Sequence, residues 1–489
     1  MSMKLDGLGP NRSLGPKNGM SEDLNLSLDL TWFFDAPNQP EPITKAAVEA
    51  LAPQAVQALE DLLAGKGRNK DGDTVMLGWQ DLPSRLDRDY LQGITKAAED
   101  LAGRVDAYVS LGIGGSYLGI EATIRALKHN YANQLPREER FSPEVYFLGQ
   151  NLDPDFMRDT LDLLRGKRVG LNVISKSGTT TETALAFRVL RSLLEGSLGQ
   201  EAKDLILVTT DASKGALRKL AEEKGYRTFV VPDDVGGRFS VLTEVGLVGL
   251  AVAGVDLEAF VAGFEAMRRR TLTTDFWKNP ALVHAACRVA AHNAGKQVEV
   301  VAVNSAGFYH LARWMEQLFP ESEGHDGKGL WVSPAMFSEK LHANGQMIQD
   351  GRRNLVETFL YLEEPDNSMP IPADPDNVDG LNYLSDRGAT MEELNRLILE
   401  GPAYAHFQAG TPSLRINIPR REPFCLGQLY YLMERSVAVS GYMMGLNPFV
   451  QPGVEAYKKA VFALAGRPGF EKEAEEMGMA LEQRERIII

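Results

Sequence analysis

Two short loops rich in glycine and hydroxyl side chains have the composition of an anion-binding site. Residues 112–116 read Gly-Ile-Gly-Gly-Ser, and residues 175–180 read Ser-Lys-Ser-Gly-Thr-Thr. Each loop follows an apolar run typical of a buried strand and precedes an amphipathic run typical of a helix. Small residues at such a junction let backbone N–H groups surround an anion, and the helix N-terminus adds its positive dipole end. The pattern predicts that the chain binds a phosphorylated small molecule.

The second loop carries most of the hydroxyl groups. A plainer interpretation is a turn whose hydroxyls cap the following helix. A loop this dense in hydroxyls directly after a buried strand favours phosphate, because each hydroxyl is a hydrogen-bond donor. The predicted phosphate anchor consists of Ser175, Ser177, Thr179 and Thr180, with Lys176 nearby.

The elements that must position these loops alternate between strand and helix. The first series has strands predicted at residues 107–111, 145–148, 169–174, 205–209 and 228–231, and helices at 116–128 and 181–194. The second series has strands predicted at 298–303, 330–332, 354–362 and 414–418, with helices at 305–319 and 424–446. Such alternation indicates parallel sheets covered on both faces.

The predicted fold class is therefore α/β, with two doubly wound domains that each contain a mainly parallel sheet flanked by helices. A chain of 489 residues is long enough for two domains. We expect an N-terminal extension at residues 1–43, a first domain at 44–253 that carries the phosphate loop, and a second domain at 254–489.

Composition limits the partners and the compartment. The net charge of −14 argues against binding to nucleic acid or to an anionic membrane. The two cysteines, Cys287 and Cys425, form no C-x-x-C motif and suggest a reducing compartment. The first twenty residues lack the apolar segment of a signal peptide, and no apolar run reaches the roughly 18 residues of a membrane span. We expect a cytoplasmic enzyme.

Several familiar motifs fail in this sequence. The dinucleotide fingerprint that begins at Gly112 breaks at Tyr117, and the nucleophile elbow around Ser116 breaks at Leu118. The sequence contains no P-loop, no H-E-x-x-H motif and no cysteine–histidine cluster. We therefore expect neither a metal nor another cofactor.

Five segments together resemble the glucose-6-phosphate isomerase (phosphoglucose isomerase) family. They are the two loops, Gly-Gly-Arg-Phe-Ser at 236–240, residues 317–324 and residues 451–458. The resemblance extends from about residue 107 to about residue 470, and residues 321–324 with 341–346 resemble its shorter bacterial branch. It implies two sugar-isomerase (SIS) domains and a role in glycolysis and gluconeogenesis. The implied reaction is the reversible isomerisation of glucose 6-phosphate and fructose 6-phosphate through ring opening and a cis-enediol(ate).

This reaction moves a proton between C1 and C2 of the sugar. It needs a carboxylate base, a cation facing the developing oxyanion, and a phosphate anchor remote from the reacting carbons. The resemblance assigns the base to Glu321 and transition-state stabilisation to Arg238. Without it, Glu321 would be interpreted as an exposed loop carboxylate. Glu323 is the nearest alternative base, and the order of the motif favours Glu321.

Ring opening requires an acid–base pair, which the resemblance assigns to His342 and Lys458. The Leu-His-x-x-Gly-Gln context selects His342 over His325. In the family the equivalent histidine comes from the partner subunit, which implies a homodimer with shared sites. The family spacing Val-Glu-x-x-Lys selects Lys458. One departure is Val450, which stands where the family motif has Asp or Asn.

Further residues are expected to contact the sugar. Gln317 lies four residues before Glu321, so a helix places both on one face. The resemblance gives sugar contacts to Gln317 and Gln451. Gly115 and Ser116 are expected to form the wall that faces the sugar.

The same fold supports other functions. An amidotransferase that makes glucosamine 6-phosphate needs an N-terminal cysteine, whereas this chain begins Met-Ser-Met and its first cysteine is Cys287. A non-catalytic sugar-phosphate sensor would lack the base or carry a DNA-binding segment. An isomerase that also accepts mannose 6-phosphate stays open, because glucose and mannose differ only at C2.

Overall fold

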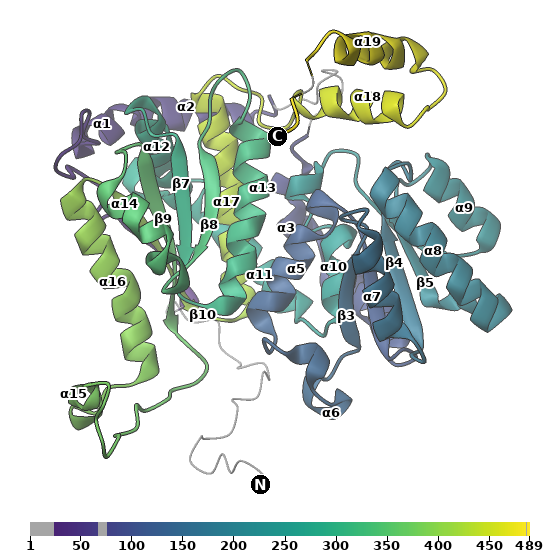
Figure 1. The fold of residues 1–489 in the computed structure, drawn as a ribbon, viewed down its shortest axis with the longest axis horizontal. Helices are drawn as coiled ribbons and strands as arrows, with labels where there is room; N and C mark the ends of the chain where they lie inside the picture. The colour runs from purple at the N-terminus through teal and green to yellow at the C-terminus, as the bar shows by residue number, and fades with distance from the viewer. Residues whose placement is uncertain (1–23, 67–75, 486) are drawn as a thin grey trace.

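The chain forms two α/β halves that lie side by side. The computed structural model describes residues 24–66, 76–485 and 487–489. In these residues the strands make two separate five-stranded sheets, one in each half (Figure 1).

The first sheet is entirely parallel. Its order is β3-β2-β4-β5-β6. The strands are β2 (Ala107–Leu111), β3 (Glu144–Leu148), β4 (Val169–Ile174), β5 (Ile206–Thr210) and β6 (Arg227–Val230). The three central strands are buried along their whole length. Burial on both faces is why they are nearly continuous apolar runs in the sequence.

Helices cover both faces of the first sheet. One face packs against α7 (Pro154–Leu164), α8 (Thr181–Leu198) and α9 (Ala216–Lys224). The other face packs against α4 (Arg88–Ala102), α5 (Leu118–Leu127) and α10 (Glu244–Val252). Short helices α3 (Leu82–Arg85) and α6 (Arg137–Arg140) complete this half.

The second sheet has the order β1-β10-β9-β7-β8. The strands are β1 (Ser27–Asp29), β7 (Val298–Val303), β8 (Trp331–Met336), β9 (Leu355–Glu364) and β10 (Ser413–Arg420). All pairs are parallel except that β1 runs antiparallel to β10. Strand β1 was not among the predicted strands, and it is only three residues long.

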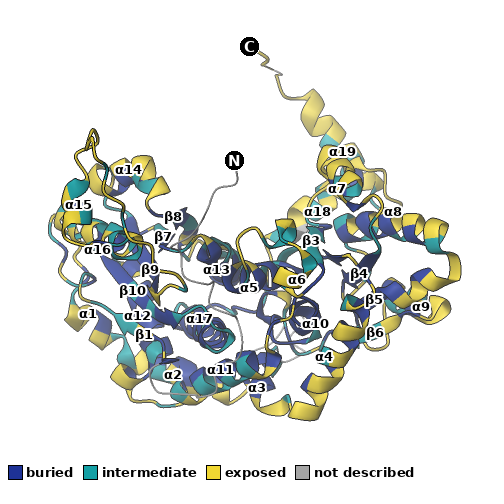
Figure 2. Ribbon diagram, turned by 90° about the horizontal axis from the view of Figure 1, so that it is seen from below, coloured by how far each residue is buried: buried dark blue, intermediate teal, exposed yellow. Residues whose placement is uncertain are grey.

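The second sheet is also covered on both faces. One face carries α14 (Asn344–Asp350) and α16 (Met391–Ala409), and a long connection that contains α15 (Asn382–Asp386) leads from β9 to α16. The other face carries α1 (Lys45–Ala50), α2 (Ala52–Leu63), α11 (Leu257–Arg270), α12 (Pro280–Asn293), α13 (Tyr309–Glu323) and α17 (Pro423–Met443). Figure 2 shows α17 buried among these helices at the centre of the molecule.

The predicted fold class is confirmed: both halves have a mainly parallel sheet flanked by helices. Helix α13 of the second half packs against α5 of the first, so the halves share one hydrophobic core. The last helices, α18 (Val454–Leu464) and α19 (Glu471–Glu482), pair with each other and project from the body (Figures 1 and 2).

The contact between α11 and α17 generates a stability prediction. A Cβ atom added at Gly427 of α17 would lie 2.2 Å from the carbonyl oxygen of Phe260 on α11. Gly427→Ala must therefore push the two helices apart, and overpacking of this kind costs about 1–3 kcal/mol of unfolding free energy. Urea unfolding monitored by circular dichroism measures the loss.

Gly401→Ala is the matched control, since Gly401 is an exposed residue of α16 and a Cβ there meets no atom within 4 Å. It should raise the unfolding free energy by roughly 0.5–1 kcal/mol, as expected for Gly→Ala inside a helix. Equal effects of the two substitutions would mean that α11 and α17 are not in close contact.

Candidate active site

An ion pair between Arg238 and Glu321 joins the two halves of the chain. Arg238 lies in a short turn after β6, and Glu321 lies in the last turn of α13. The Nη1 atom of Arg238 donates to Oε1 of Glu321 at 3.0 Å. The Arg238 side chain is 4% exposed, whereas that of Glu321 is 21% exposed. The carboxylate is thus open to a solute while the guanidinium behind it is enclosed.

Arg238 also fixes two other segments. Its Nε atom donates to Oγ of Ser322 at 2.7 Å, and its Nη2 atom donates to the carbonyl oxygens of Pro448 and, at 3.2 Å, Val450. A guanidinium has five N–H donors. Among the described residues, these contacts leave one Nη1 proton without an acceptor, and that proton can meet a substrate oxygen.

Burial and pairing act in opposite directions on Arg238. Burial lowers the pKa of its guanidinium, and the neighbouring Glu321 carboxylate opposes that shift. The intrinsic pKa of arginine is so high that the group stays charged at any physiological pH. The site therefore keeps a permanent positive charge beside the carboxylate of Glu321.

Gln317 holds the other oxygen of Glu321. Its Nε2 atom donates to Oε2 of Glu321 at 2.8 Å, which fits the prediction that the two side chains share a helical face. The Oε1 atom of Gln317 is buried and has no hydrogen-bond partner among the described residues. This amide oxygen can accept a hydrogen bond from a sugar hydroxyl.

The helix that carries Glu321 is longer than the sequence indicated. The sequence predicts that it ends at residue 319, but α13 continues through Pro320 to Glu323. A proline lacks the N–H of a regular helix, yet the carbonyl of Pro320 still accepts from the backbone of Gly324 at 2.8 Å. Side-chain contacts of the last three residues hold this turn, so Glu321 sits on a helix rather than on a loop.

The two nearby glutamates have different environments. Glu323 is 1% exposed and pairs with Arg288, whose Nη2 lies 2.7 Å from its Oε2 atom. The hydroxyl of Ser440 donates to the other oxygen of Glu323. Glu323 has no open face toward a solute, so the geometry favours Glu321 as the base.

The glycine loop after β2 lies against this ion pair. A Cβ atom added at Gly115 would lie 2.0 Å from the carbonyl oxygen of Gly237, and one at Gly114 would lie 2.9 Å from Nε2 of Gln317. Gly114 also has a positive φ of 58°. Glycine is therefore required here so that the backbone from Gly114 to Ser116 can approach Arg238 and Gln317. This placement fits a wall that faces the sugar.

The hydroxyl loop after β4 is ordered by its own side chains. Ser175 Oγ accepts from the backbone of Gly178 at 3.0 Å and lies 3.4 Å from Oγ1 of Thr180. Ser177 Oγ accepts from the backbone and the hydroxyl of Thr179, at 3.2 and 3.0 Å. Ser177 and Thr179 are exposed. The loop therefore forms the hydrogen-bonded turn that the plainer interpretation predicts. This turn leaves the hydroxyls of Ser177 and Thr179 accessible to solvent.

The N-terminus of α8 follows directly from this loop. The side chain of Thr180, the N-cap residue, makes no capping hydrogen bond to the helix. The first N–H groups of a helix need an external acceptor, and an anion can provide it. Lys176 is exposed but points elsewhere, because its Nζ atom pairs with Asp233 at 2.9 Å. The loop can thus bind phosphate through hydroxyls and helix N–H groups.

Both loops lie at one edge of the first sheet. Strands β2 and β4 are neighbours, and the chain leaves β2 toward β3 on the other side before it returns to β4. Ligands of doubly wound α/β folds bind where the strand order reverses in this way. The strand order therefore brings the two loops together at the expected position.

The structure does not bring His342 to this cluster within the chain. His342 is exposed at the end of a short turn (Glu339–His342), and α14 follows it. Figures 1 and 2 place α14 on the side of the second sheet away from the first half. Gln451 is exposed directly after Val450, and Lys458 lies on the projecting helix α18.

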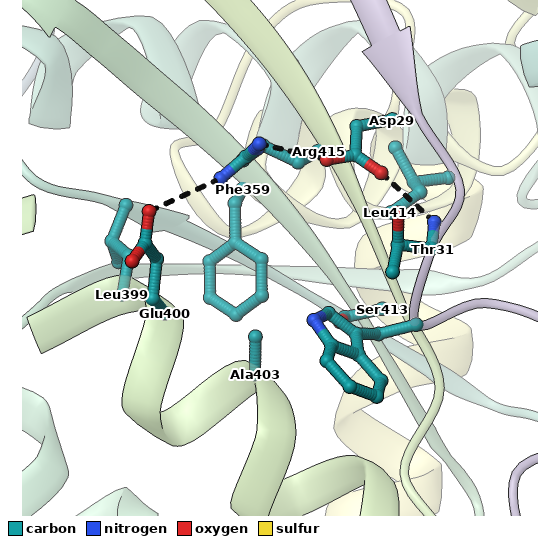
Figure 3. Close-up of a pocket in the computed structure, with 10 residues that line it drawn as sticks. Asp29, Thr31, Phe359, Leu399, Glu400, Ala403, Ser413, Leu414 and Arg415 are labelled. Atoms are coloured by element: carbon teal, nitrogen blue, oxygen red, sulfur yellow. Dashed lines mark hydrogen bonds and ion pairs between the residues drawn. The ribbon is translucent and has the colours of Figure 1, made fainter. Parts of the chain in front are cut away.

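One cavity lies away from these loops. It measures about 290 Å³ and is lined by residues of β1, β10, β9 and α16 (Figure 3). Arg415 pairs there with Asp29 at 2.7 Å and with Glu400 at 3.9 Å. Its one cation is already flanked by two carboxylates, so this cavity does not suit a phosphate.

Sequence reasoning missed several residues that shape the site. Ser322 lies inside the segment 317–324 that resembles the family, and its hydroxyl accepts from Nε of Arg238. The carbonyl of Pro448 and the side chains of Arg288 and Ser440 have no local sequence signal, since they reach the site from distant elements.

The fold and the two loops define a doubly wound α/β protein whose ligand site lies at the carboxyl edge of a parallel sheet. The family model described as phosphoglucose isomerase matches residues 68–337, which include both loops, Arg238 and Glu321. The chain belongs to this family.

Relatives of the chain agree with that assignment. A glucose-6-phosphate isomerase of Shouchella clausii is 46% identical over 426 residues, which are 87% of this chain and 93% of the relative. One of Bacillus cereus is 47% identical over 409 residues, 83% of this chain and 90% of the relative. Membership thus rests on similarity along most of both sequences.

Solved structures agree on the fold. A glucose-6-phosphate isomerase of Chlamydia trachomatis superposes with a TM-score of 0.76 at 19% identity, over 94% of this chain and 92% of that one. A hypothetical protein of Thermus thermophilus superposes with a TM-score of 0.78 at 29% identity, over 91% of this chain and all of the other. Among the described residues, no helix has the length and apolar character needed to cross a membrane.

The contact at Val450 generates a prediction about the departure from the family motif. Val450 meets Arg238 through its backbone carbonyl, which any residue type can supply. Val450→Asn should therefore leave kcat/KM within about threefold of the wild type, which corresponds to roughly 0.65 kcal/mol. Steady-state kinetics with fructose 6-phosphate measure this. A loss of more than about tenfold would mean that the side chain at this position takes part in the site.

Proposed function

We propose that the chain catalyses the reversible isomerisation of glucose 6-phosphate and fructose 6-phosphate through a cis-enediol(ate). The observation that carries the proposal is the Arg238–Glu321 pair, in which an accessible carboxylate is fixed by an enclosed guanidinium and by Gln317. This pair gives the base and the oxyanion partner that proton transfer between C1 and C2 requires.

We propose that the phosphate binds to Ser175, Ser177, Thr179 and Thr180 and to the first N–H groups of α8. Binding at this end holds the sugar so that C1 and C2 reach Glu321. Lys176 contributes positive charge near the loop rather than a direct contact, because it is paired with Asp233. Gly115, Ser116, Gln317 and Gln451 contact the sugar.

The proton movements balance over the reaction. His342 and Lys458 transfer a proton between the C1 hydroxyl and the ring oxygen, which opens the ring. Glu321 removes the proton from C2 of the aldose, and the negative charge that develops on O1 faces the remaining N–H of Arg238. Glu321 then returns the proton to C1, while a proton moves between O1 and O2, and the ketose forms.

We also propose that the chain acts as a homodimer in the cytoplasm. His342 is exposed and lies just before α14, the helix on the side of the second sheet away from the first half. A histidine so placed can complete the site of a second copy. The proposed units are an N-terminal extension at residues 1–43 and two domains at 44–253 and 254–489.

Proton transfer by Glu321 is tested in deuterated water. Starting from fructose 6-phosphate, the wild type should place deuterium at C2 of the glucose 6-phosphate product, because the carboxyl proton exchanges with solvent. Glu321→Gln removes the base and should lower kcat by about 10²–10⁴-fold, the usual contribution of a general base. Binding of fructose 6-phosphate, measured by calorimetry, should persist.

Two results would contradict this account. Near wild-type turnover in Glu321→Gln would show that another residue is the base. Absence of isomerase activity in the wild type would contradict the proposed function itself and favour a sugar-phosphate sensor.

Sharing of the site between subunits is tested by mixing two inactive variants. His342→Ala and Glu321→Gln homodimers are unfolded and refolded together in equal amounts. If His342 acts in the partner's site, half of the dimers are mixed and each holds one intact site, so activity should return to about one quarter of the wild type. If His342 acts within its own chain, every site keeps a lesion and no activity returns.

A further inference from the structure

We propose that Glu323, Arg288 and Glu299 form a buried charge cluster that positions the general base. This inference rests on the proposed function, because it concerns how Glu321 is held in place. In it, Glu323 and Arg288 are positioning residues that act through the last turn of α13 and do not touch the substrate.

The last turn of α13 is held from two sides. Successive helix residues point about 100° apart, so Glu321 and Glu323 lie on nearly opposite faces. Glu321 and Ser322 bind Arg238 from the first half. Glu323 turns inward and binds Arg288 of α12 and Ser440 of α17. One turn of helix is thus fixed between two arginines.

The inner arginine is enclosed on all sides. Arg288 is 3% exposed, and Glu299 of β7 and Glu323 are each 1% exposed. Arg288 pairs with both carboxylates, and Glu299 accepts from the hydroxyl of Thr358 on β9 at 2.6 Å. The guanidinium carbon of Arg288 lies 3.8 Å from the ring centroid of Phe319. The cluster therefore links α13 to two strands and two helices.

The helix needs this support because its own backbone is weak at this point. Pro320 directly precedes Glu321 and cannot donate the hydrogen bond of a regular helix. A carboxylate at the C-terminal end of a helix is also disfavoured by the helix dipole. Glu323 lies at that end, so the positive charge of Arg288 is needed to stabilise the Glu323 carboxylate there.

Stability alone does not explain such a cluster. Buried ion pairs can often be replaced by apolar residues without loss of stability. The free energy of folding therefore does not by itself account for a buried ion pair. What the cluster provides is a defined orientation of the turn that carries Glu321. A displacement of about 1 Å at a reacting group can reduce the rate about a hundredfold.

The test compares two buried carboxylates. Glu323→Gln removes a charge from the cluster. Glu357→Gln removes a fully buried carboxylate of β9 that pairs at 2.9 Å with His406 of α16, on the sheet face that α16 covers. Both variants should unfold at lower temperature than the wild type. Only Glu323→Gln should lower kcat, by at least about fivefold, with KM for fructose 6-phosphate within about threefold, because the phosphate loop is untouched.

The outcomes separate the alternatives. A kcat for Glu323→Gln within fivefold of the wild type, or an equal fall in Glu357→Gln, overturns the positioning role. If Glu323→Gln does not fold, Glu323→Asp and Glu357→Asp are compared by the same criterion, since a shortened carboxylate at 323 also displaces the turn. Failure of the proposed function would appear separately, as absence of activity in the wild type.

Discussion

The contact between Arg238 and Glu321 is the interaction on which the rest of the site depends. A nearly enclosed guanidinium requires a compensating charge, and Glu321 is the carboxylate that pairs with it. The same guanidinium binds Ser322 and the carbonyls of Pro448 and Val450. One side chain thereby fixes the end of α13, the glycine turn after β6 and the segment that leads to α18. The two halves of the chain meet at the group that we propose as the base.

The second half repeats the topology of the first without repeating its chemistry. The order β8-β7-β9-β10 corresponds to β3-β2-β4-β5, so both sheets reverse their strand order at equivalent positions. In the second sheet this position has a cavity of about 250 Å³, lined by Asn304, Glu363, Glu392 and Glu393 among others. Three glutamates in the lining face one arginine, Arg396, so the net charge of the lining is negative and disfavours a phosphate. The fold thus has one such position in each sheet, and the side chains make only the position in the first sheet suitable for an anion. Function here depends on the residues of the site rather than on the fold.

Much of the fold could be predicted because its signals are local. The buried parallel strands are continuous apolar runs, and the loops after β2 and β4 stand out by their glycine and hydroxyl content. The edge strand β1 has no such signal, because three residues are too few to show an alternation of apolar and polar side chains. Its pairing with β10 also joins residues almost 400 positions apart in the sequence. The predicted helix ends at residue 319, yet tertiary contacts of Glu321, Ser322 and Glu323 extend α13 beyond Pro320.

The site residues were predicted with uneven physical support. Glu321, Arg238 and Gln317 lie in direct contact, and Gly115 has no room for a side chain, so geometry supports their proposed roles. His342 stands apart within the chain, and its role rests on the resemblance and on a second subunit. The environment that distinguishes Glu321 from Glu323 comes from α12 and α17, which lie far away in the sequence. No local pattern could have revealed it.

The most direct measurement is a crystal structure of the protein with a six-carbon sugar-acid phosphate that mimics the enediolate. The account predicts that the phosphate lies within hydrogen-bond distance of the hydroxyls of Ser177 and Thr179. It also predicts that the atoms that correspond to C1 and C2 lie beside the Glu321 carboxylate, with an oxygen facing Arg238. A phosphate bound elsewhere, or reacting carbons away from Glu321, would contradict the account.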